Sequence, residues 1–343
     1  MKRPLTAAVR AGDASPVALP LEPLDELQVQ ILVDNVADAL LPGREGEVIR
    51  RPFGPAVENP LLDAPRVASA VVAEHGFACL VTARAGGRVH RFLFDAGLSP
   101  TALVHNLERL ELDPRDIEAV ALSHGHFDHT GGLAGLVERL GRRELPVLVH
   151  PDAFRQRRSN PPGGRVLPLP PPSRSALEGA GFRLVVDREP HLLFDGLVAL
   201  TGEVPRVTEF EQGYPYFEYL AGGEWLPEPH LMDDQAVVAR VRGRGAVVIT
   251  GCGHAGAVNI ARRALELTGE ERLAGIIGGL HLQPLSFFAI PETVAGLAAL
   301  EPGLVAAGHC TGFEALRQLA EALPEAFVVN AVGTTYRFAA AEG

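Results

Sequence analysis

The sequence is poor in cysteine, in long apolar runs and in positive charge, and each shortage excludes a class of protein. Three cysteines in 343 residues are too few, and odd in number, for a disulfide framework, which favours a reducing cytoplasm. No run of about 18 apolar residues occurs, so no membrane-spanning helix is expected. The formal net charge of −11 argues against a nucleic-acid-binding surface.

What is present suits one large folded unit. Apolar residues make up 47% of the chain, enough to bury a sizeable core. Residues 1–27 are rich in proline and alanine, show no clear period and lack the apolar stretch of a signal peptide. We therefore expect an N-terminal extension over 1–27 and a single domain over 28–338.

Strands and helices alternate along this domain. Apolar runs such as Val29–Asn35, Ile117–Ser123 and the two halves of a hairpin around AGGR predict strands. Patterns such as GLAGLVERLG and AGAVNIARRALELTG predict helices. Both halves of the chain run from strands into helices, which predicts an α/β fold of two sheets with helices outside. The segment RQRRSNPPGGRVLPLPPPSRS (Arg155–Ser175) is rich in proline and is expected to be a surface loop or lid.

Four metal-ligand side chains crowd into the stretch AVALSHGHFDHTGGL, where a buried strand meets a helix. They are His124, His126, Asp128 and His129. Strand ends followed by helices are where open α/β sheets place their sites. Imidazole nitrogens and a carboxylate suit Zn²⁺, Mn²⁺ or Fe²⁺. The spacing therefore predicts a metal site, and its two halves can face two adjacent ions.

Three later histidines occupy the same kind of position beside glycines. His254 lies in TGCGHAG, His281 in IIGGLHL and His309 in AAGHCTG. Thr311 and Glu314 have the spacing of a capping box, which would place His309 directly before a helix. Their location makes them candidates for the remaining ligands.

Taken together, these motifs resemble the metallo-β-lactamase fold superfamily. SHGHFDHTGGL and FLFDAG are similar to its signature, and EHGFA, LTGEVPR, TGCGHAGAVN and GHCTG are similar to the branch that includes an archaeal 7,8-dihydropterin-6-methyl-4-(β-D-ribofuranosyl)aminobenzene-5′-phosphate synthase. The resemblance covers about residues 28 to 338. It implies a four-layer αββα sandwich of two mixed β-sheets with helices on the outer faces.

The resemblance also implies two metal positions. The first would be held by His124, His126 and His254, and the second by Asp128, His129 and His309. Asp95 would orient ligands from behind. Most of the superfamily has a bridging aspartate where this chain has Cys252. Cys252 would either ligate as a thiolate or be a small buried residue behind the histidine, and we favour the second.

The expected activity is hydrolysis by a metal-bound hydroxide on a small anionic ester or phosphoester. Two divalent ions, Zn²⁺ before Mn²⁺ or Fe²⁺, would activate the water and stabilise the developing anion. Asp128 would align the hydroxide, and His281 would protonate the leaving group. Arg206 would bind the anion, together with the arginines before the proline-rich loop, which are Arg155, Arg157 and Arg158.

Other functions stay open at this point. The resemblance also implies a transferase that condenses a hydroxymethyl-dihydropterin pyrophosphate with an aryl amine phosphate, using the same ligands. Minor alternatives are a redox protein or a non-catalytic ligand-binding protein on this fold. We expect a small-molecule substrate and neither a nucleic-acid nor a membrane partner, and the sequence leaves the oligomeric state open.

Overall fold

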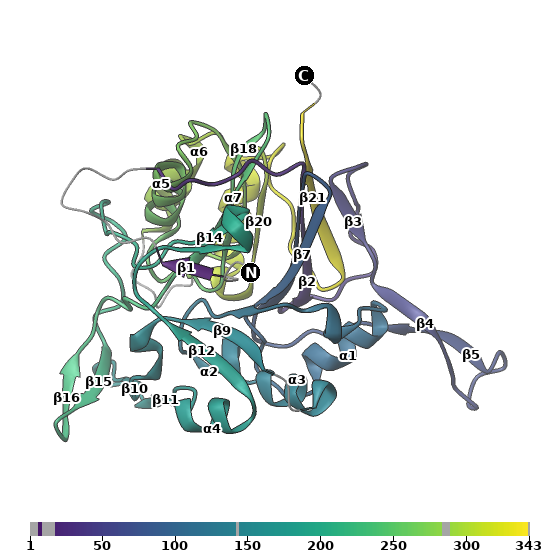
Figure 1. The fold of residues 1–343 in the computed structure, drawn as a ribbon, viewed down its shortest axis with the longest axis horizontal. Coiled ribbons are helices and arrows are strands. Elements are labelled where there is room, and N and C mark those ends of the chain that lie inside the picture. The colour runs from purple at the N-terminus through teal and green to yellow at the C-terminus, as the bar shows by residue number, and fades with distance from the viewer. Residues whose placement is uncertain (1–5, 9–17, 142–143, 283–288, 342–343) are drawn as a thin grey trace.

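Two large mixed β-sheets form the middle of the molecule in the computed structural model, which describes residues 6–8, 18–141, 144–282 and 289–341 (Figure 1). Within these residues the first sheet has eight strands in the order β12-β9-β8-β7-β6-β2-β21-β3. They are β2 (Glu26–Val33), β3 (Val48–Arg50), β6 (Ala78–Ala85), β7 (Arg88–Phe94), β8 (Val120–Ala121), β9 (Leu145–Val149), β12 (Phe182–Val186) and β21 (Thr334–Ala339). β6 and β7 form the predicted hairpin, because Gly86 and Gly87 adopt the positive φ angles that its two-residue turn needs.

The second sheet has seven strands in the described part of the chain, in the order β1-β13-β14-β17-β18-β19-β20. They are β1 (Thr6–Ala8), β13 (His191–Leu193), β14 (Val198–Leu200), β17 (Ala236–Val241), β18 (Gly245–Thr250), β19 (Leu273–Gly279) and β20 (Val305–Gly308). The last three strands run parallel. Their connections contain α5 (Ala257–Thr268) and α6 (Ile290–Ala298), and α7 (Phe313–Ala322) follows β20.

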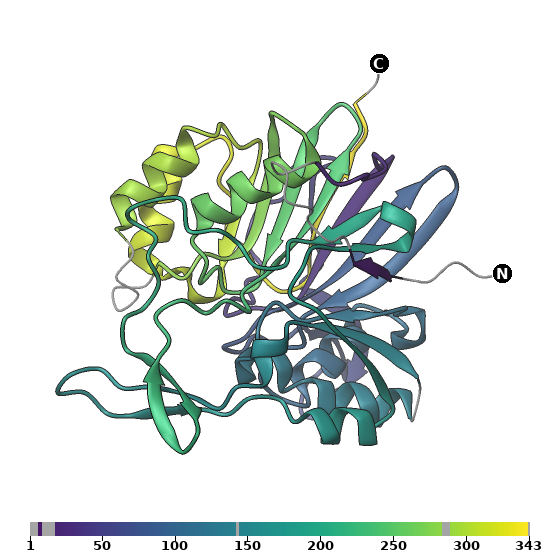
Figure 2. The same ribbon diagram turned by 60° about the vertical axis from the view of Figure 1, so that its left-hand side comes forward.

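Three apolar layers hold the sheets and helices together. Between the sheets, side chains such as Phe92 and Ile249 pack in one core. On the outer face of the first sheet, Leu107 of α1 (Ala102–Arg109) and Leu136 of α3 (Leu133–Leu140) pack against it. On the outer face of the second sheet, residues such as Ile260 of α5 do the same. Figure 2 shows helices on both sides, so the predicted four-layer αββα sandwich is confirmed.

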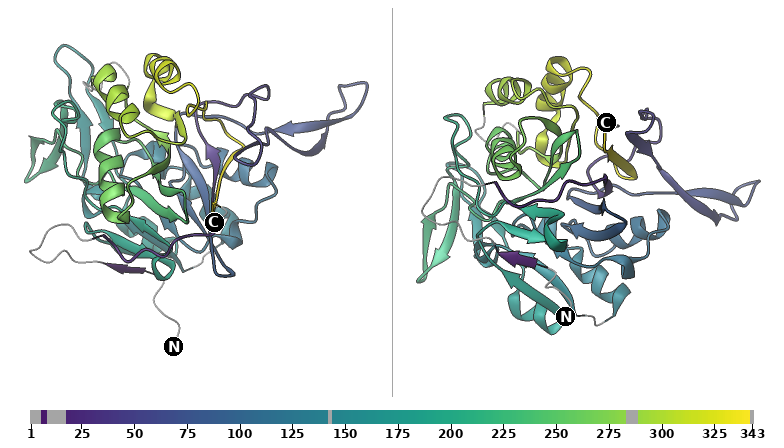
Figure 3. Two further views of the ribbon diagram at one scale, coloured as in Figure 1. Left: turned by 90° about the horizontal axis from the view of Figure 1, so that it is seen from above. Right: turned by 45° about the horizontal axis from the view of Figure 1, so that its top comes forward.

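The proline-rich segment is more regular than expected. It contributes β10 (Arg157–Ser159), β11 (Leu167–Leu169) and the start of α4 (Arg174–Gly179), and the two strands join β15 (Phe217–Ala221) and β16 (Glu224–Pro227) in a small sheet. This corrects the expectation of an irregular loop. Pro168 is tolerated because β11 is an edge strand, where a missing N–H group leaves no partner unpaired. A second hairpin, β4 (Phe53–Glu58) with β5 (Arg66–Ala70), projects from the body (Figure 3).

The region expected to be an N-terminal extension also contacts the domain. Thr6–Ala8 pairs with β13 at the edge of the second sheet. Further along, Leu19, Leu21 and Leu24 are buried, and the Leu24 N–H group donates to the carbonyl oxygen of Arg240. Leucine side chains in a segment that was read as proline- and alanine-rich without a clear period explain why it folds onto the core. None of the helices in the described residues is long and apolar enough to span a membrane.

Candidate metal centre

The predicted ligands meet where strands of both sheets end. His124 and His126 follow β8, and Asp128 and His129 lie in the short helix α2 (Phe127–Thr130). The loop between β8 and α2 is held from outside, because the Gly125 N–H group donates to Asp233 Oδ2 at 2.9 Å. A side chain at Gly125 would collide with the carbonyl oxygen of Ala153, so this position needs glycine. The second sheet supplies the remaining ligands from the ends of β18 and β20.

The first ligand group consists of His124, His126 and His254. One ring nitrogen from each lies within 4.8 Å of the other two, and all three residues are buried. Among the described residues, none provides a hydrogen-bond partner for the Nε2 atom of any of these rings. Buried polar atoms are normally paired, so three orphaned nitrogens that converge fit a metal ion with imidazole ligands.

Hydrogen bonds and burial prepare these rings for coordination. Ser123 Oγ donates to Asp95 Oδ2 at 2.7 Å, which leaves it to accept from Nδ1 of His124 at 2.9 Å. His124 is thereby held in the tautomer with a lone pair on Nε2. Burial lowers the pKa of His124 and of His254 well below the usual value, and lowers the pKa of His126 to about 4. Neutral imidazole is the form that binds a metal ion.

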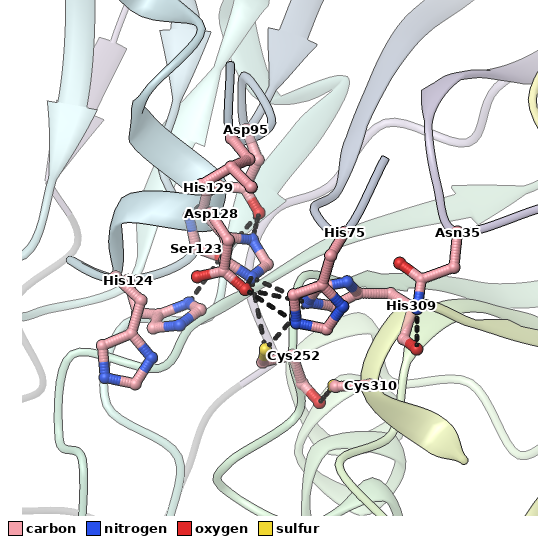
Figure 4. A network of polar contacts seen from close by, with 12 residues as sticks. Asn35, His75, Asp95, Ser123, His124, Asp128, His129, Cys252, His309 and Cys310 are labelled. Carbon is pink, nitrogen blue, oxygen red and sulfur yellow. Dashed lines mark hydrogen bonds and ion pairs between the residues drawn. The ribbon is translucent and has the colours of Figure 1, made fainter. Parts of the chain in front are cut away.

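The second group consists of Asp128, His129, Cys252 and His309, shown in Figure 4. The sulfur of Cys252 lies 3.2 Å from Nε2 of His129 and 3.3 Å from Nε2 of His309. Asp128 Oδ2 lies 3.5 Å from the same atom of His309. Cys252 thus points to the ligand side of the centre, not behind the histidine as we favoured. Imidazole, carboxylate and thiol groups together fit a zinc-type ion.

Asp95 lies behind this second group, as the sequence suggested. Its Oδ2 atom is 2.7 Å from Nδ1 of His129, and its Oδ1 atom accepts the Ser123 N–H group at 2.7 Å. Asp95 adopts a left-handed backbone with φ of 58° directly after β7, which aspartate tolerates better than most residues. The carboxylate fixes the His129 proton on Nδ1, so Nε2 faces the other ligands.

The charges of the second group are strongly coupled. Burial alone would lower the pKa of His129, but the carboxylates of Asp95 and Asp128 raise it to about 9. Burial would raise the pKa of Asp128, yet His129 and His309 hold it at about 2. Burial lowers the pKa of His309 to about 4. A cation bound here would take the place of the proton on Nε2 of His129 and pair with the Asp128 carboxylate.

His309 is held by residues that the sequence reading missed. Asp34 Oδ1 accepts the His309 N–H group at 3.2 Å, and the Asn35 side chain donates to the His309 carbonyl oxygen at 2.9 Å. These contacts keep His309 in a left-handed conformation with φ of 47°. The only sign of this role in the sequence was that two polar residues, Asp34 and Asn35, end the apolar strand VQILVDN. The capping box was wrong, because Gly312 precedes α7 without a side-chain cap and Thr311 Oγ1 donates to Gly308 instead.

His75 was also missed as a site residue. Its Nε2 atom lies 3.7 Å from Asp128 Oδ2, and its ring is 5.0 Å from the ring of His309. The backbone beside it is fixed, because the Phe77 N–H group donates to the Asp128 carbonyl oxygen. EHGFA belongs to the motifs that carry the family resemblance, but that resemblance assigned no role to its histidine.

A pocket of about 320 Å³ opens over both ligand groups. Its lining is His75, His126, Phe127, Asp128, Ser159, Leu167, Leu169, Tyr214, Phe217, Cys252, His254, His281 and Cys310. The ring of His281 stands 4.1 Å from that of His254, so His281 does reach the site. The small sheet supplies Phe217 and Leu169, which makes one wall apolar. No lysine or arginine occurs among these lining residues.

The arginines expected to bind an anion are engaged elsewhere in the described structure. Arg157 is buried and pairs with Glu228 and Asp233, while Arg155 pairs with Glu228 and Asp152. Arg158 pairs with Glu218. The side chain of Arg206 donates to the carbonyl oxygens of Val204 and Leu231. None of the four lines the pocket over the ligands, so their role in binding substrate stays a prediction.

Comparisons with known proteins agree with this architecture. The profile of the Metallo-beta-lactamase superfamily matches residues 80–257, just over half of the chain. The chain is 29% identical over 269 residues to the 7,8-dihydropterin-6-methyl-4-(beta-D-ribofuranosyl)-aminobenzene-5'-phosphate synthase of Methanocaldococcus jannaschii, covering 77% of this chain and 90% of that protein. It is also 29% identical over 250 residues to an uncharacterized protein of the same organism, covering 73% and 88% of the two chains.

Among solved structures, the crystal structure of a metal-dependent hydrolase of the beta-lactamase superfamily is similar in fold. It aligns with a TM-score of 0.64 and 23% identity, over 92% of this chain and 100% of that one. The shared architecture extends over nearly the whole chain.

Proposed function

The chain belongs to the metallo-beta-lactamase superfamily, and on that premise we propose that it is a hydrolase that uses two divalent metal ions on a small ester or phosphoester. The first ion would be held by His124, His126 and His254. The second would be held by Asp128, His129 and His309, with Cys252 as a fourth ligand. The observation that carries this proposal is the convergence of three buried, orphaned Nε2 atoms beside a second group of ligands.

The ions would supply Lewis acidity, which lowers the pKa of water and stabilises negative charge on the substrate. Imidazole and thiol ligands favour Zn²⁺, whereas Mn²⁺ or Fe²⁺ would rely on the histidines and Asp128. This choice of metal is part of the proposal.

The protein side chains would orient the reactants. Asp128 is ionised, since its pKa is held at about 2, so its carboxylate can accept a hydrogen bond from water in the pocket and align that water. Asp95 would keep His129 in the tautomer that coordination needs. His281, which stands beside His254 at the pocket wall, would donate a proton to the leaving group.

The shape of the pocket constrains the substrate. Phe217, Tyr214 and Leu169 offer an apolar and partly aromatic wall on one side, which suits an organic group with a flat or apolar face. Since the described lining includes no lysine or arginine, a phosphate or carboxylate on the substrate would be met by the ions themselves. We therefore propose a small ester or phosphoester with an apolar substituent.

A second candidate function is supported by one specific observation. The synthase from Methanocaldococcus jannaschii matches this chain over 90% of its own length. A related reaction here would join a dihydropterin pyrophosphate to an aryl amine phosphate, with pyrophosphate as the leaving group. The ions held by the same ligands would then stabilise the departing phosphate oxygens, and the apolar wall would take the pterin ring.

The two candidates are separated by one set of assays on the protein reconstituted with Zn²⁺ or Mn²⁺. We expect turnover on a chromogenic panel of phosphodiester, thioester and lactone substrates, with His126→Ala inactive. His105→Ala is the matched control, because His105 bonds the Ala70 carbonyl oxygen far from the ligands. A metal-loaded protein that hydrolyses nothing on the panel, yet releases pyrophosphate from a pterin pyrophosphate only when an aryl amine is added, would replace the hydrolase by the transferase.

A further inference from the structure

Three neighbouring parallel strands of the second sheet each carry a soft metal ligand at the same offset. Cys252 lies two residues beyond β18, His281 two residues beyond β19 and Cys310 two residues beyond β20. Adjacent strands are about 4.8 Å apart, so equal offsets at one sheet edge bring side chains together. One donor atom of each of the three residues lies within 4.8 Å of the other two.

Local packing keeps the two sulfurs close. Cys310 Sγ contacts the carbonyl oxygen of Cys252 at 3.3 Å. A side chain on Gly279 would have its Cβ atom 2.9 Å from this sulfur, so glycine at the end of β19 makes room for it. His281 adopts a left-handed backbone with φ of 48°. Such a conformation in a histidine is uncommon and is concentrated at functional sites.

We propose that Cys252, His281 and Cys310 form a third metal position that takes a thiophilic ion such as Zn²⁺, Cd²⁺ or Cu⁺. Soft ions prefer thiolate sulfur and also bind imidazole, whereas Mg²⁺ and Mn²⁺ favour sites with oxygen ligands. All three residues line the pocket, so a fourth ligand can reach the ion from that side. With an ion bound at this position, His281 would coordinate it instead of donating a proton to a leaving group.

The charge balance of this position is favourable. Each thiol that binds a divalent ion loses its proton to solvent, so two thiolates neutralise one divalent charge. An ion added here therefore brings little net charge when both thiols lose their protons to it, and about one positive charge when Cys252 already ligates the second ion. Cys252 belongs to both the second group and this one, so its sulfur would bridge two ions when both are bound. Thiophilic ions would then also occupy the third position, whereas Mg²⁺ and Mn²⁺ would not bind there.

The test is a titration of the reduced protein with Cd²⁺, followed through the thiolate-to-metal charge-transfer band. At saturation, the band of the wild-type protein is expected to have the intensity of two cadmium-bound thiolates per chain. The band of Cys310→Ala should have about half this intensity, because Cys252 is then the one thiolate left at the centre. Cys79→Ala is the matched control, since Cys79 is buried in β6 within the core between the sheets. Cys310→Ser serves as a second variant that keeps the size of the side chain.

The outcomes are distinct from those that test the proposed function. An unchanged band in both Cys310 variants would overturn the third position, because Cys252 alone would then account for the signal. His126→Ala, which removes a ligand of the first group only, is expected to keep the band while abolishing turnover. His281→Ala is expected to weaken Cd²⁺ binding about 10-fold or more at an unchanged intensity per bound ion.

Discussion

The sulfur of Cys252 lies 3.2 Å from Nε2 of His129, on the side where the other ligands of the second group converge. In the sequence, this is the position at which the family resemblance implies a bridging aspartate in most members. Burial raises the pKa of the Cys252 thiol well above its usual value when no cation is present. A bound soft cation would reverse this, because coordination stabilises the thiolate.

From this contact we predict that Cys252→Ala weakens binding of the second ion by about 10- to 100-fold. Cys252→Asp is expected to restore a second ion and to shift the preference from Zn²⁺ towards Mn²⁺, since a carboxylate replaces sulfur. Equilibrium dialysis of each variant against both metals measures the two affinities. If the alanine and aspartate variants bind both metals like wild type, Cys252 is not a ligand.

A second prediction concerns the carboxylate behind His129. Asp95→Asn keeps the size of the side chain, and asparagine tolerates the left-handed backbone at this position. Its amide group would donate to Nδ1 of His129, which favours the tautomer with the proton on Nε2. We therefore expect metal affinity to fall by about 10- to 100-fold with little change in fold.

Isothermal titration calorimetry with Zn²⁺ checks this result, with circular dichroism as the test of folding. Asp116→Asn is the matched control, because Asp116 forms an exposed ion pair with Arg91. Equal zinc affinities for Asp95→Asn and the control would mean that Asp95 does not set the tautomer.

The residues around the centre show what a sequence can predict about it. The candidate ligands at the ends of β8, β18 and β20 could be predicted because short polar motifs follow apolar strands, and this pattern is local. The alternation of strands and helices predicted two sheets with helices outside, and the family resemblance implied the four-layer αββα arrangement. Asp34 and Asp233 were missed because they act through backbone N–H groups of residues far away in the chain. The residues next to an aspartate in the sequence do not indicate that it accepts such a long-range hydrogen bond.

Two arginines illustrate the opposite error, in which the sequence suggested a site role for residues that the structure engages elsewhere. Arg157 and Arg158 are neighbours in a polar, proline-rich segment, and the sequence suggested the same exposed role for both. In the structure they alternate across β10, so one side chain enters the interior and the other stays near solvent. A strand of three residues between prolines is too short to be recognised from its period. Its pairing with β11 and β15 decides which side chain is buried.

Arg157 yields a third prediction. It pairs with Asp233, which in turn accepts the Gly125 N–H group between His124 and His126. Arg157→Met would leave Asp233 as a buried carboxylate without its cation and Glu228 with Arg155 alone, which costs about 3–5 kcal/mol of unfolding free energy. It should also weaken binding of the first ion, because the loop that carries both histidines loses its support.

Urea denaturation and zinc titration measure the two effects. Arg158→Met is the matched control, since it removes the neighbouring positive charge from a partly exposed ion pair and should cost far less. If both variants lose the same stability, the buried network does not support the loop.

The fourth prediction is a pH dependence set by Asp34. This carboxyl group is fully buried, and burial raises its pKa to about 6 from 3.8 although it accepts hydrogen bonds from the His309 and Asn35 N–H groups. Between these two values the folded protein holds a proton that the unfolded chain has released. Stability must therefore fall as the pH rises from about 4 to about 6, by about 3 kcal/mol in total, and stay reduced above that range.

Asp34→Asn removes the titrating group. The unfolding free energy of the variant should therefore lack this change with pH, even if the variant is less stable at every pH. The measurement is the difference in unfolding free energy between wild type and variant at pH 4 and pH 7, in chelator so that metal binding does not contribute. Asp38→Asn, at an exposed position nearby, controls for the loss of a carboxylate. A difference that stays constant across this range would show that Asp34 is ionised in the folded protein at both pH values. In that case its bonds to the His309 loop, rather than a buried proton, would balance the cost of burial.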